Sequence, residues 1–294
     1  MMADAVASSL RLFRHIRVAA EAIRLEQSLF ALPFTMAGLL LGARGLPEAR
    51  VVFWSVVAFS GARTLGMAAN RLIDRRIDAR NPVARTRALP AGLMSAWEMG
   101  LIAVGGAGLL VLGAAQLNPL CLALSPLAAA IVTLYPYMKR FTWLCHAGVG
   151  LSLGSGPVGG WLAATGAFES GTWLLGFAVF FWATGFDILW HGSDVAFDRQ
   201  ERLYSLPASF GVSVAFMVAK VCHLAALACL FATGLLTQMG PLFWVGLLAA
   251  TALLIQEHRL VRPDGPGPGR SFFLVNSSVS FAALLGVVGG LYGS

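Results

Sequence analysis

The chain has 294 residues, of which 57% are hydrophobic and only 12% are charged, and its mean hydropathy is +0.75. A soluble domain carries about 25% charged residues, so this composition excludes a soluble domain. One membrane span takes about 20 apolar residues, so the apolar content also exceeds that of a single-span anchor. The 33 glycines and 8 tryptophans favour helices packed in lipid over a barrel of alternating strands. We therefore expect an all-α polytopic membrane protein.

The apolar stretches predict about nine transmembrane helices. Their centres lie near Phe34, Ala58, Ala107, Ala128, Gly154, Phe181, Leu224, Leu247 and Leu284. Four arginines precede the first stretch, but no small-residue cleavage site follows it, so we expect a first span and not a cleaved signal. These arginines are Arg11, Arg14, Arg17 and Arg24.

The basic residues are distributed unequally between the two sides of the predicted bundle. Of the 21 Lys and Arg residues, all except Arg44, Arg50, Arg63 and Lys220 lie before the first helix or in every second connection. Cytoplasmic connections collect Lys and Arg. We therefore expect a cytoplasmic N-terminus, an outside C-terminus, and a cytoplasmic position for the long charged connections at residues 71–97 and 191–211.

The net charge of +7 and the four cysteines add little information about function. A basic excess in a membrane protein is first a topology signal, so we expect no nucleic-acid partner. The cysteines stand singly in apolar stretches without a CxxC pair, which indicates neither a disulfide framework nor a zinc site.

The first candidate site lies at the end of the second predicted helix. Asn70, Asp74 and Asp78 are spaced i, i+4, i+8, so their side chains lie along one helical face. Carboxylates on one stripe repel each other, and carboxylate with amide oxygens suits a hard cation such as Mg²⁺. The alternative is that the acids pair with arginines of the same segment at a solvated helix end, namely Arg71, Arg75 and Arg76.

A second acidic stripe lies at the end of the sixth predicted helix. Asp187, Asp194 and Asp198 fall within about 40° of one another if the helix continues past Gly192. Asp187 stands among aromatic and aliphatic residues, where a carboxylate is costly unless it faces a polar cavity. The two stripes together predict a divalent-metal site shared between two helices, with coordination positions left for substrate phosphates.

Cations near these acids are candidates for holding phosphate charge. Arg63 lies about two turns before Asn70 on the same face, too deep in its helix for a topology signal. Lys139 and Arg140 follow Tyr135-Pro136-Tyr137, and Arg85 and Arg87 follow the first acidic motif, where basic residues also mark the cytoplasmic side.

The fifth predicted helix is rich in glycine. Its glycines favour close helix packing, with a groove for an isoprenoid tail as the alternative. The five histidines are scattered, and only His191 lies beside an acidic stripe. The glycines are Gly148, Gly150, Gly154, Gly156, Gly159 and Gly160.

These motifs resemble those of the UbiA-type membrane prenyltransferases. Asn70-x-x-x-Asp74-x-x-x-Asp78 and Asp194-x-x-x-Asp198 are similar to the paired aspartate motifs of that family, and Tyr135-Pro-Tyr-Met-Lys139-Arg140 resembles a third signature. Further similarity lies in residues 23–34 and 205–211. The resemblance covers nearly the whole chain and implies one UbiA-like membrane domain over residues 1–294, with its active site on the cytoplasmic side.

The resemblance implies Mg²⁺-dependent transfer of a polyprenyl group from polyprenyl diphosphate to an aromatic acid at the bacterial inner membrane. Within the family it is nearest to 4-hydroxybenzoate polyprenyltransferases of ubiquinone synthesis and to the futalosine-route enzymes of menaquinone synthesis. Arg71 stands where many 4-hydroxybenzoate enzymes have Asp, which keeps a naphthoate-type acceptor open.

The resemblance also implies roles for individual residues. The expected metal ligands are Asn70, Asp74, Asp78, Asp194 and Asp198. The expected catalytic residues are Asp74, Asp194, Asp198 and Arg63. The expected substrate-binding residues are Asn70, Arg71, Lys139, Arg140 and Asp187. The sequence does not rank Arg63, Arg71, Lys139 and Arg140 as partners of the acceptor carboxylate.

A cation-coupled transporter is the competing function from another class, because intramembrane acids also mark ion pathways. Transporters place their sites near the midplane and contain internal repeats, whereas these acids gather at one membrane face.

Overall fold

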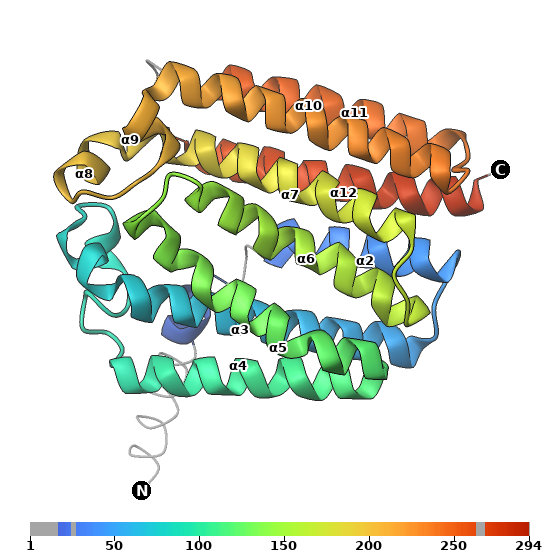
Figure 1. Cartoon of the computed structure of the whole chain (residues 1–294), viewed down its shortest axis with the longest axis horizontal. Helices are drawn as coiled ribbons and strands as arrows, with labels where there is room; N and C mark the ends of the chain where they lie inside the picture. Colours follow the sequence, from blue (N-terminus) through green and yellow to red (C-terminus); the bar gives the residue numbers. More distant parts are fainter. Residues whose placement is uncertain (1–16, 25–27, 263–267, 294) are drawn as a thin grey trace, which may run out of the picture.

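The computed structural model describes residues 17–24, 28–262 and 268–293, and it contains helices and no β-strand over these residues. Nine long helices form the bundle in the described part of the chain (Figure 1). They are α2 (Ser28–Ala43), α3 (Ala49–Arg80), α4 (Ala96–Leu117), α5 (Pro119–Leu134), α6 (Cys145–Thr165), α7 (Ser170–Trp190), α10 (Val212–Leu236), α11 (Pro241–Leu260) and α12 (Arg270–Tyr292).

Short helical segments connect these long helices. Two are α-helical, α8 (Val195–Gln200) and α9 (Leu206–Phe210). Three are 3₁₀ turns, η2 (Ala84–Thr86), η3 (Tyr135–Arg140) and η4 (His191–Ser193). Figure 1 shows α8 and α9 at one end of the bundle and the C-terminus at the other. We call the first of these the α8 end.

The predicted all-α membrane architecture is confirmed. Within the described ranges, seven helical segments are long and apolar enough to cross a bilayer, and α2 contributes a shorter apolar helix. Each of the nine predicted centres lies within one of the nine long helices. Arg11, Arg14 and residues 25–27 lie outside the described residues, whereas Arg17 belongs to a helical segment at 17–22. The chain is therefore an integral membrane protein.

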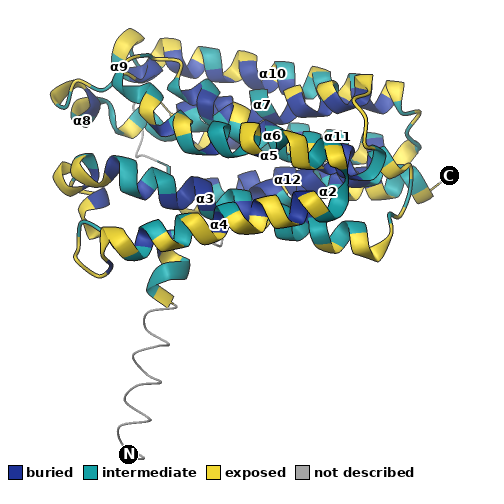
Figure 2. Cartoon of the chain, turned by 60° about the horizontal axis from the view of Figure 1, so that its bottom comes forward, coloured by how far each residue is buried: buried dark blue, intermediate teal, exposed yellow. Residues whose placement is uncertain are grey.

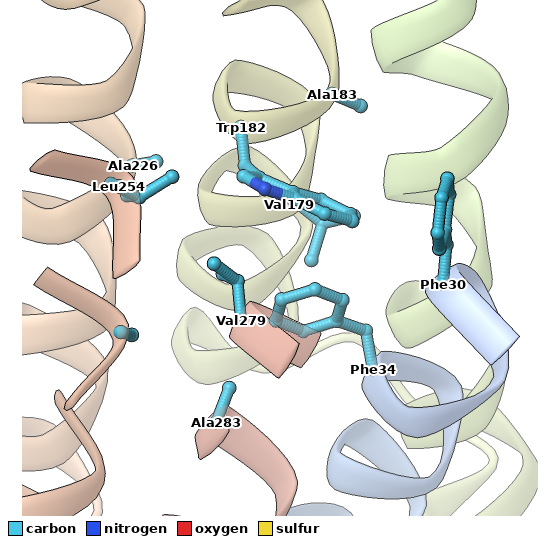
Figure 3. Close-up of a cluster of buried hydrophobic side chains, with 10 residues drawn as sticks. Phe30, Phe34, Val179, Trp182, Ala183, Ala226, Leu254, Val279 and Ala283 are labelled. Carbon is cyan, nitrogen blue, oxygen red and sulfur yellow. The ribbon is translucent and has the colours of Figure 1, made fainter. Parts of the chain in front are cut away.

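The helices pack mainly as neighbours in sequence. α3 lies along α4, α6 lies between α2 and α7, α10 packs on α7, and α11 packs on α12. A central cluster of buried side chains joins α2, α7 and α12, and Figure 3 shows Phe34 beside Trp182, with ring centroids 4.9 Å apart. Large apolar side chains also cover much of the outer surface, where Figure 2 shows exposed residues along the helices. This outer apolar surface suits a lipid environment.

Glycines bring several helices into close contact, as lipid-embedded helices require because lipid offers little hydrophobic driving force for their association. A Cβ at Gly106 would lie 2.6 Å from the backbone nitrogen of Leu65, so α3 and α4 need this glycine. In α6, a Cβ at Gly154 would lie 2.8 Å from the carbonyl oxygen of Gly176 on α7. On the other face of α6, a Cβ at Gly160 would overlap the carbonyl oxygen of Thr35 on α2.

The glycines of α6 serve both of the roles considered from the sequence. Gly154 and Gly160 allow close packing, whereas Gly156 and Gly159 border an apolar cavity. A Cβ at Gly159 would meet no atom within 4 Å. The helix is therefore packed tightly along two faces and left open along a third.

A chain of buried polar side chains joins α7, α11 and α12. Trp182 Nε1 donates to Asn276 Oδ1 at 3.1 Å, and Asn276 Nδ2 donates to Glu257 Oε1 at 2.9 Å. Asn276 and Glu257 are fully buried. Polar groups in such surroundings are costly unless they bond to one another, so this chain fixes how the three helices meet.

We predict that Gly160→Ala destabilises the fold by about 1–3 kcal/mol, because the added methyl group forces α2 and α6 apart. Gly159→Ala is the matched control, since its methyl group enters open space. Thermal unfolding of the purified protein in detergent measures the difference. Equal midpoints for Gly160→Ala and the wild type would contradict the close contact.

Candidate functional site

The acids and the amide singled out in the sequence border one cavity at the α8 end. This cavity measures about 260 Å³ and lies between α3, η3, α7 and the α8–α9 segment. All five predicted metal ligands line it, together with Arg63, Arg71, Lys139 and Asp187. Of the candidate cations named from the sequence, Arg140 and Arg85 do not line this cavity.

Helical periodicity brings the first stripe into the cavity wall. Asp74 and Asp78 are one turn apart on α3 and are 2% and 4% exposed, whereas Arg75 and Arg76 lie on the outer face of the same helix. Asn70, one turn before Asp74, lies within 3.4 Å of Asp74 Oδ2 through its Nδ2 atom. The stripe is therefore turned away from water, not laid along a solvated helix end.

The cations that neutralise this stripe come from elsewhere in the chain. Lys139 Nζ donates to Asp74 Oδ2 at 2.6 Å, and Arg140 donates to Asp74 Oδ1 at 3.0 Å. Arg87 Nη1 donates to Asp78 Oδ1 at 2.8 Å. The pairing with Arg71, Arg75 and Arg76 considered from the sequence is not observed.

Arg71 has a different set of contacts. Its guanidinium is buried and donates to the carbonyl oxygen of Ala22 at 3.0 Å and to Asn70 Oδ1 at 3.3 Å. Arg71 therefore joins the segment before α2 to the cavity wall and fixes the amide of Asn70.

The second stripe reaches the same cavity by a different geometry from the one expected. The helix does not continue past Gly192, because α7 ends at Trp190, η4 follows, and α8 begins at Val195. A Cβ at Gly192 would lie 2.8 Å from the ring of Phe216, so the turn is packed closely against α10. Asp194 and Asp198 still border the cavity because α8 folds back beside it.

The α8 segment orients its two acids differently. Ser205 Oγ donates to Asp198 Oδ2 at 2.7 Å, and the same hydroxyl accepts from Ala208 N at the start of α9. Asp194 stands just outside the spanning segments, where burial and the nearby Asp198 carboxylate raise its pKa. A cation placed between the two acidic stripes would lower the pKa of Asp194.

A histidine that the sequence analysis left aside holds Asp187. His146, at the start of α6, is 1% exposed and its Nδ1 lies 2.7 Å from Asp187 Oδ2. Its Nε2 accepts from Leu206 N at 3.2 Å, so Nδ1 carries the proton and donates to Asp187. Both ring nitrogens are therefore engaged, and neither has a free lone pair for a metal. No local sequence pattern identifies His146 as a site residue. The only feature that could have pointed to it is its position at the same membrane level as the acids.

His191, the histidine that the sequence did mark, lies close to the same carboxylate. Its Nδ1 is 2.9 Å from the carbonyl oxygen of Asp187 and 3.6 Å from Asp187 Oδ2. The rings of His146 and His191 meet edge to face with centroids 5.1 Å apart. Asp187 thus faces the cavity between two imidazoles.

An apolar cavity of about 180 Å³ adjoins the polar one. It lies between α2, α3, α4, α5 and α6, and small or aliphatic residues make most of its wall. Both cavities are bordered by Arg63 and Tyr135, together with Ala31, Met67 and Leu153. A charged compartment and an apolar compartment therefore meet at Arg63.

The polar cavity has the donor set of a hard divalent cation. Its acids and amide offer only oxygen and no thiolate, and among the described residues Asp78 Oδ2 is buried without a hydrogen-bond partner. A buried acceptor left without a partner fits a ligand that the protein itself does not supply. The arginines and the lysine beside these acids suit a polyanion such as a phosphate ester.

Comparison with known proteins identifies relatives along most of the chain. The model of the UbiA prenyltransferase family matches residues 31–285. The chain is 31% identical over 256 residues to a 4-hydroxybenzoate octaprenyltransferase of Nitrosomonas eutropha, covering 86% of this chain and 88% of that protein. A protein of the same name from Vibrio cholerae is 30% identical over 261 residues, covering 89% and 92%.

Solved structures share the fold. The apo structure of a UbiA homolog from Aeropyrum pernix gives a TM-score of 0.81 at 31% identity and covers 90% of this chain and 97% of that chain. A UbiA homolog from Archaeoglobus fulgidus, solved bound to GPP and Mg²⁺, gives a TM-score of 0.69 at 19% identity and covers 92% and 99%.

We predict that His146→Phe lowers stability by about 1–3 kcal/mol, because it leaves the Asp187 carboxylate and the Leu206 N–H without their partners in a buried setting. His191→Phe is the control, since His191 is 30% exposed at its side chain and bonds chiefly to a backbone oxygen. Thermal unfolding in detergent compares the two. A smaller loss of stability in His146→Phe than in His191→Phe would contradict the conclusion that His146 holds Asp187.

Proposed function

This chain belongs to the UbiA prenyltransferase family, and we propose that it transfers a polyprenyl group from polyprenyl diphosphate to the ring of an aromatic acid, with 4-hydroxybenzoate as the favoured acceptor. The observation that carries the proposal is the junction of two unlike cavities at Arg63. A prenyl diphosphate is likewise a polyanionic head joined to an apolar tail. The polar cavity suits its head and the apolar cavity suits its tail.

Mg²⁺ is the cation we propose for the polar cavity, held by Asn70, Asp74, Asp78, Asp194 and Asp198. When bound, it would neutralise charge on the diphosphate and so make this group a better leaving group. The donor set of hard oxygens and the partnerless Asp78 Oδ2 support this assignment. A UbiA homolog from Archaeoglobus fulgidus has been solved with GPP and Mg²⁺.

The chain's own cations would hold the diphosphate in place. Arg63 borders both cavities, so its guanidinium is placed to bind the diphosphate next to the carbon that carries it. Lys139 and Arg140 bind Asp74 and thereby keep its carboxylate in the cavity wall. Positive charge aimed at a departing anion lowers the barrier for its departure.

The reaction we propose breaks the bond between the allylic carbon and the diphosphate oxygen, and the electron pair leaves with the diphosphate. The ring carbon ortho to the acceptor hydroxyl then forms a bond to the allylic carbon, and the ring loses a proton to the released diphosphate. Asp187 borders the cavity and is held by His146, so we assign it to binding the acceptor hydroxyl. The apolar walls exclude water, which would otherwise capture the allylic cation.

The acceptor carboxylate needs a cationic partner. Arg140 borders an outer depression and not the cavity, so Arg63, Arg71 and Lys139 are the better candidates. The names of relatives at 30–31% identity support 4-hydroxybenzoate. A naphthoate-type acceptor is the second candidate, because Arg71 stands where many 4-hydroxybenzoate enzymes have Asp.

We also propose an inner-membrane location with the α8 end in the cytoplasm. Both acidic stripes and the segments 71–97 and 191–211, the first of which begins with the end of α3, would then face the water-soluble acceptor. The basic residues would then obey the positive-inside rule. The N-terminus would be cytoplasmic and the C-terminus would lie outside.

We expect purified protein with a polyprenyl diphosphate, 4-hydroxybenzoate and Mg²⁺ to release diphosphate and form a prenylated acid, and to stop when a chelator is in excess. Asp74→Asn and Asp198→Asn should each lower kcat by about 10²- to 10³-fold, because each removes charge from the proposed cation site. Glu48→Gln, an exposed acid at the opposite end, is the control.

Mass spectrometry of the product identifies the acceptor when the acid is varied. Product from a naphthoate-type acid alone would move the assignment to the second candidate. Full turnover in excess chelator, or unchanged rates in both variants, would contradict the proposed site.

The orientation predicts how cysteines will react in intact cells. In a variant lacking Cys121, Cys145, Cys222 and Cys229, Ala167→Cys should react with an impermeant thiol reagent added outside. Ala91→Cys should react only after the membrane is opened. Both positions are exposed, at opposite ends of the bundle. Labelling of Ala91→Cys in intact cells would overturn the orientation.

A further inference from the structure

A basic depression lies on the outside of the α8 end, beside the polar cavity, with which it shares Ile77 and Leu203. It measures about 760 Å³ and is bordered by Arg75, Arg76 and Arg80 of α3, Tyr137 and Arg140 of η3, and Glu201 after α8. Aliphatic side chains of α3 make up much of the remaining wall. The depression therefore combines four guanidinium groups and one carboxylate with an apolar lining.

Two of these arginines have partners within the protein. Arg80 pairs with Glu201 at 2.6 Å, which joins the end of α3 to the end of α8. Arg140 donates to Asp74 Oδ1 and to the carbonyl oxygens of Ile73 and Pro136, and its guanidinium carbon lies 5.2 Å from the centre of the Tyr137 ring. The positive charges of both side chains are therefore paired or hydrogen-bonded within the protein.

Arg75 and Arg76 differ from this pair. Both are exposed, and no ion pair or hydrogen bond of either side chain occurs within the described residues. Their charges are therefore available to an external anion. A guanidinium fork binds two phosphate oxygens at once, so adjacent arginines in a concave site favour a phosphate group.

The depression lies at the level of lipid headgroups. Arg75 comes 26 residues after the start of α3 at Ala49, which is about 40 Å along the helix axis. The hydrocarbon core is only about 30 Å thick. Exposed aromatic residues, which mark the membrane interface, occur at the same end in Tyr137, Phe141 and Trp143. A lipid headgroup would therefore meet the depression from the side while its acyl chains stay in the bilayer.

We propose that this depression is a binding site for a phosphate-bearing anion, the headgroup of an anionic phospholipid, with Arg75 and Arg76 as its main contacts. A scattered positive-inside signal does not require a concave site with an apolar lining beside it, whereas a diacyl phosphate headgroup matches both features. The site is independent of the catalytic assignment, because neither arginine borders the polar cavity.

The test measures lipid binding and not turnover. Purified protein in phosphatidylcholine micelles is titrated with phosphatidylglycerol, and bound lipid is counted by native mass spectrometry while the unfolding midpoint is followed. We expect one retained phosphatidylglycerol and a raised midpoint for the wild type. The double variant Arg75→Gln/Arg76→Gln should bind about tenfold more weakly.

The matched control is Arg259→Gln/Arg262→Gln, which removes the same charge from exposed residues at the same end of the bundle but outside the depression. It should bind as the wild type does. Equally weakened phosphatidylglycerol binding in both double variants would show that only general surface charge matters, and would overturn the proposal. Failure of the wild type to prefer phosphatidylglycerol over phosphatidylcholine would also overturn it.

Two further measurements distinguish the occupant of the depression and control for misfolding. Inorganic diphosphate added to phosphatidylcholine micelles distinguishes a soluble occupant: a midpoint rise that is lost only in Arg75→Gln/Arg76→Gln would support the phosphate site but overturn the lipid as its occupant. The single variant Arg76→Gln and the conservative variant Arg75→Lys/Arg76→Lys guard against misfolding. The first should bind more weakly than the wild type, and the second should retain more binding than the glutamine pair because it keeps the charge.

Discussion

Carboxylates buried at one end of a lipid-embedded bundle are the constraint on which the rest of this structure depends. Asp74, Asp78 and Asp198 are each less than 9% exposed, and an uncompensated charge in such surroundings is very costly. Each acid is therefore held by a cation or a hydroxyl brought from another segment. The long α3 helix, the η3 turn and the folded-back α8 segment are arranged so that these partners reach the acids.

The same arrangement separates two chemical environments within one small space. Acids and cations line the polar cavity, while small residues of α6 leave the neighbouring space apolar. Gly160 lets α6 approach α2 and Gly159 leaves the adjoining face open, so one helix both closes the bundle and shapes the apolar cavity. A substrate with a charged head and an apolar tail requires this contrast between the two cavities. The described fold already contains both cavities side by side.

The sequence predicts local and periodic features well and long-range ones poorly. The i, i+4, i+8 spacing correctly places Asn70, Asp74 and Asp78 on one face, and the membrane class, the family and the enzyme class are confirmed. The shared face expected for Asp187, Asp194 and Asp198 required a helix continuous past Gly192, and this condition is not met, because a one-dimensional period cannot reveal the turn at η4. The three acids nevertheless border the same cavity.

Partners distant in the chain were the hardest to foresee. Arg140 and Lys139 reach Asp74 from more than sixty positions away, and His146 reaches Asp187 across 41. The spacing of Arg71, Arg75 and Arg76 does not show that these nearer cations fail to pair with the acids of the first stripe, which bind more distant cations instead. That outcome depends on which face of α3 packs against η3, and only the assembled fold determines it.

We propose that the two acidic segments bind a divalent cation and a prenyl diphosphate together. Isothermal titration of the purified protein with a prenyl thiolodiphosphate, which resists bond cleavage, tests it most directly when run with Mg²⁺ and again in excess chelator. We expect binding with Mg²⁺ that weakens by about tenfold or more in excess chelator and likewise in Asp78→Asn. Equal affinity under all three conditions would contradict it.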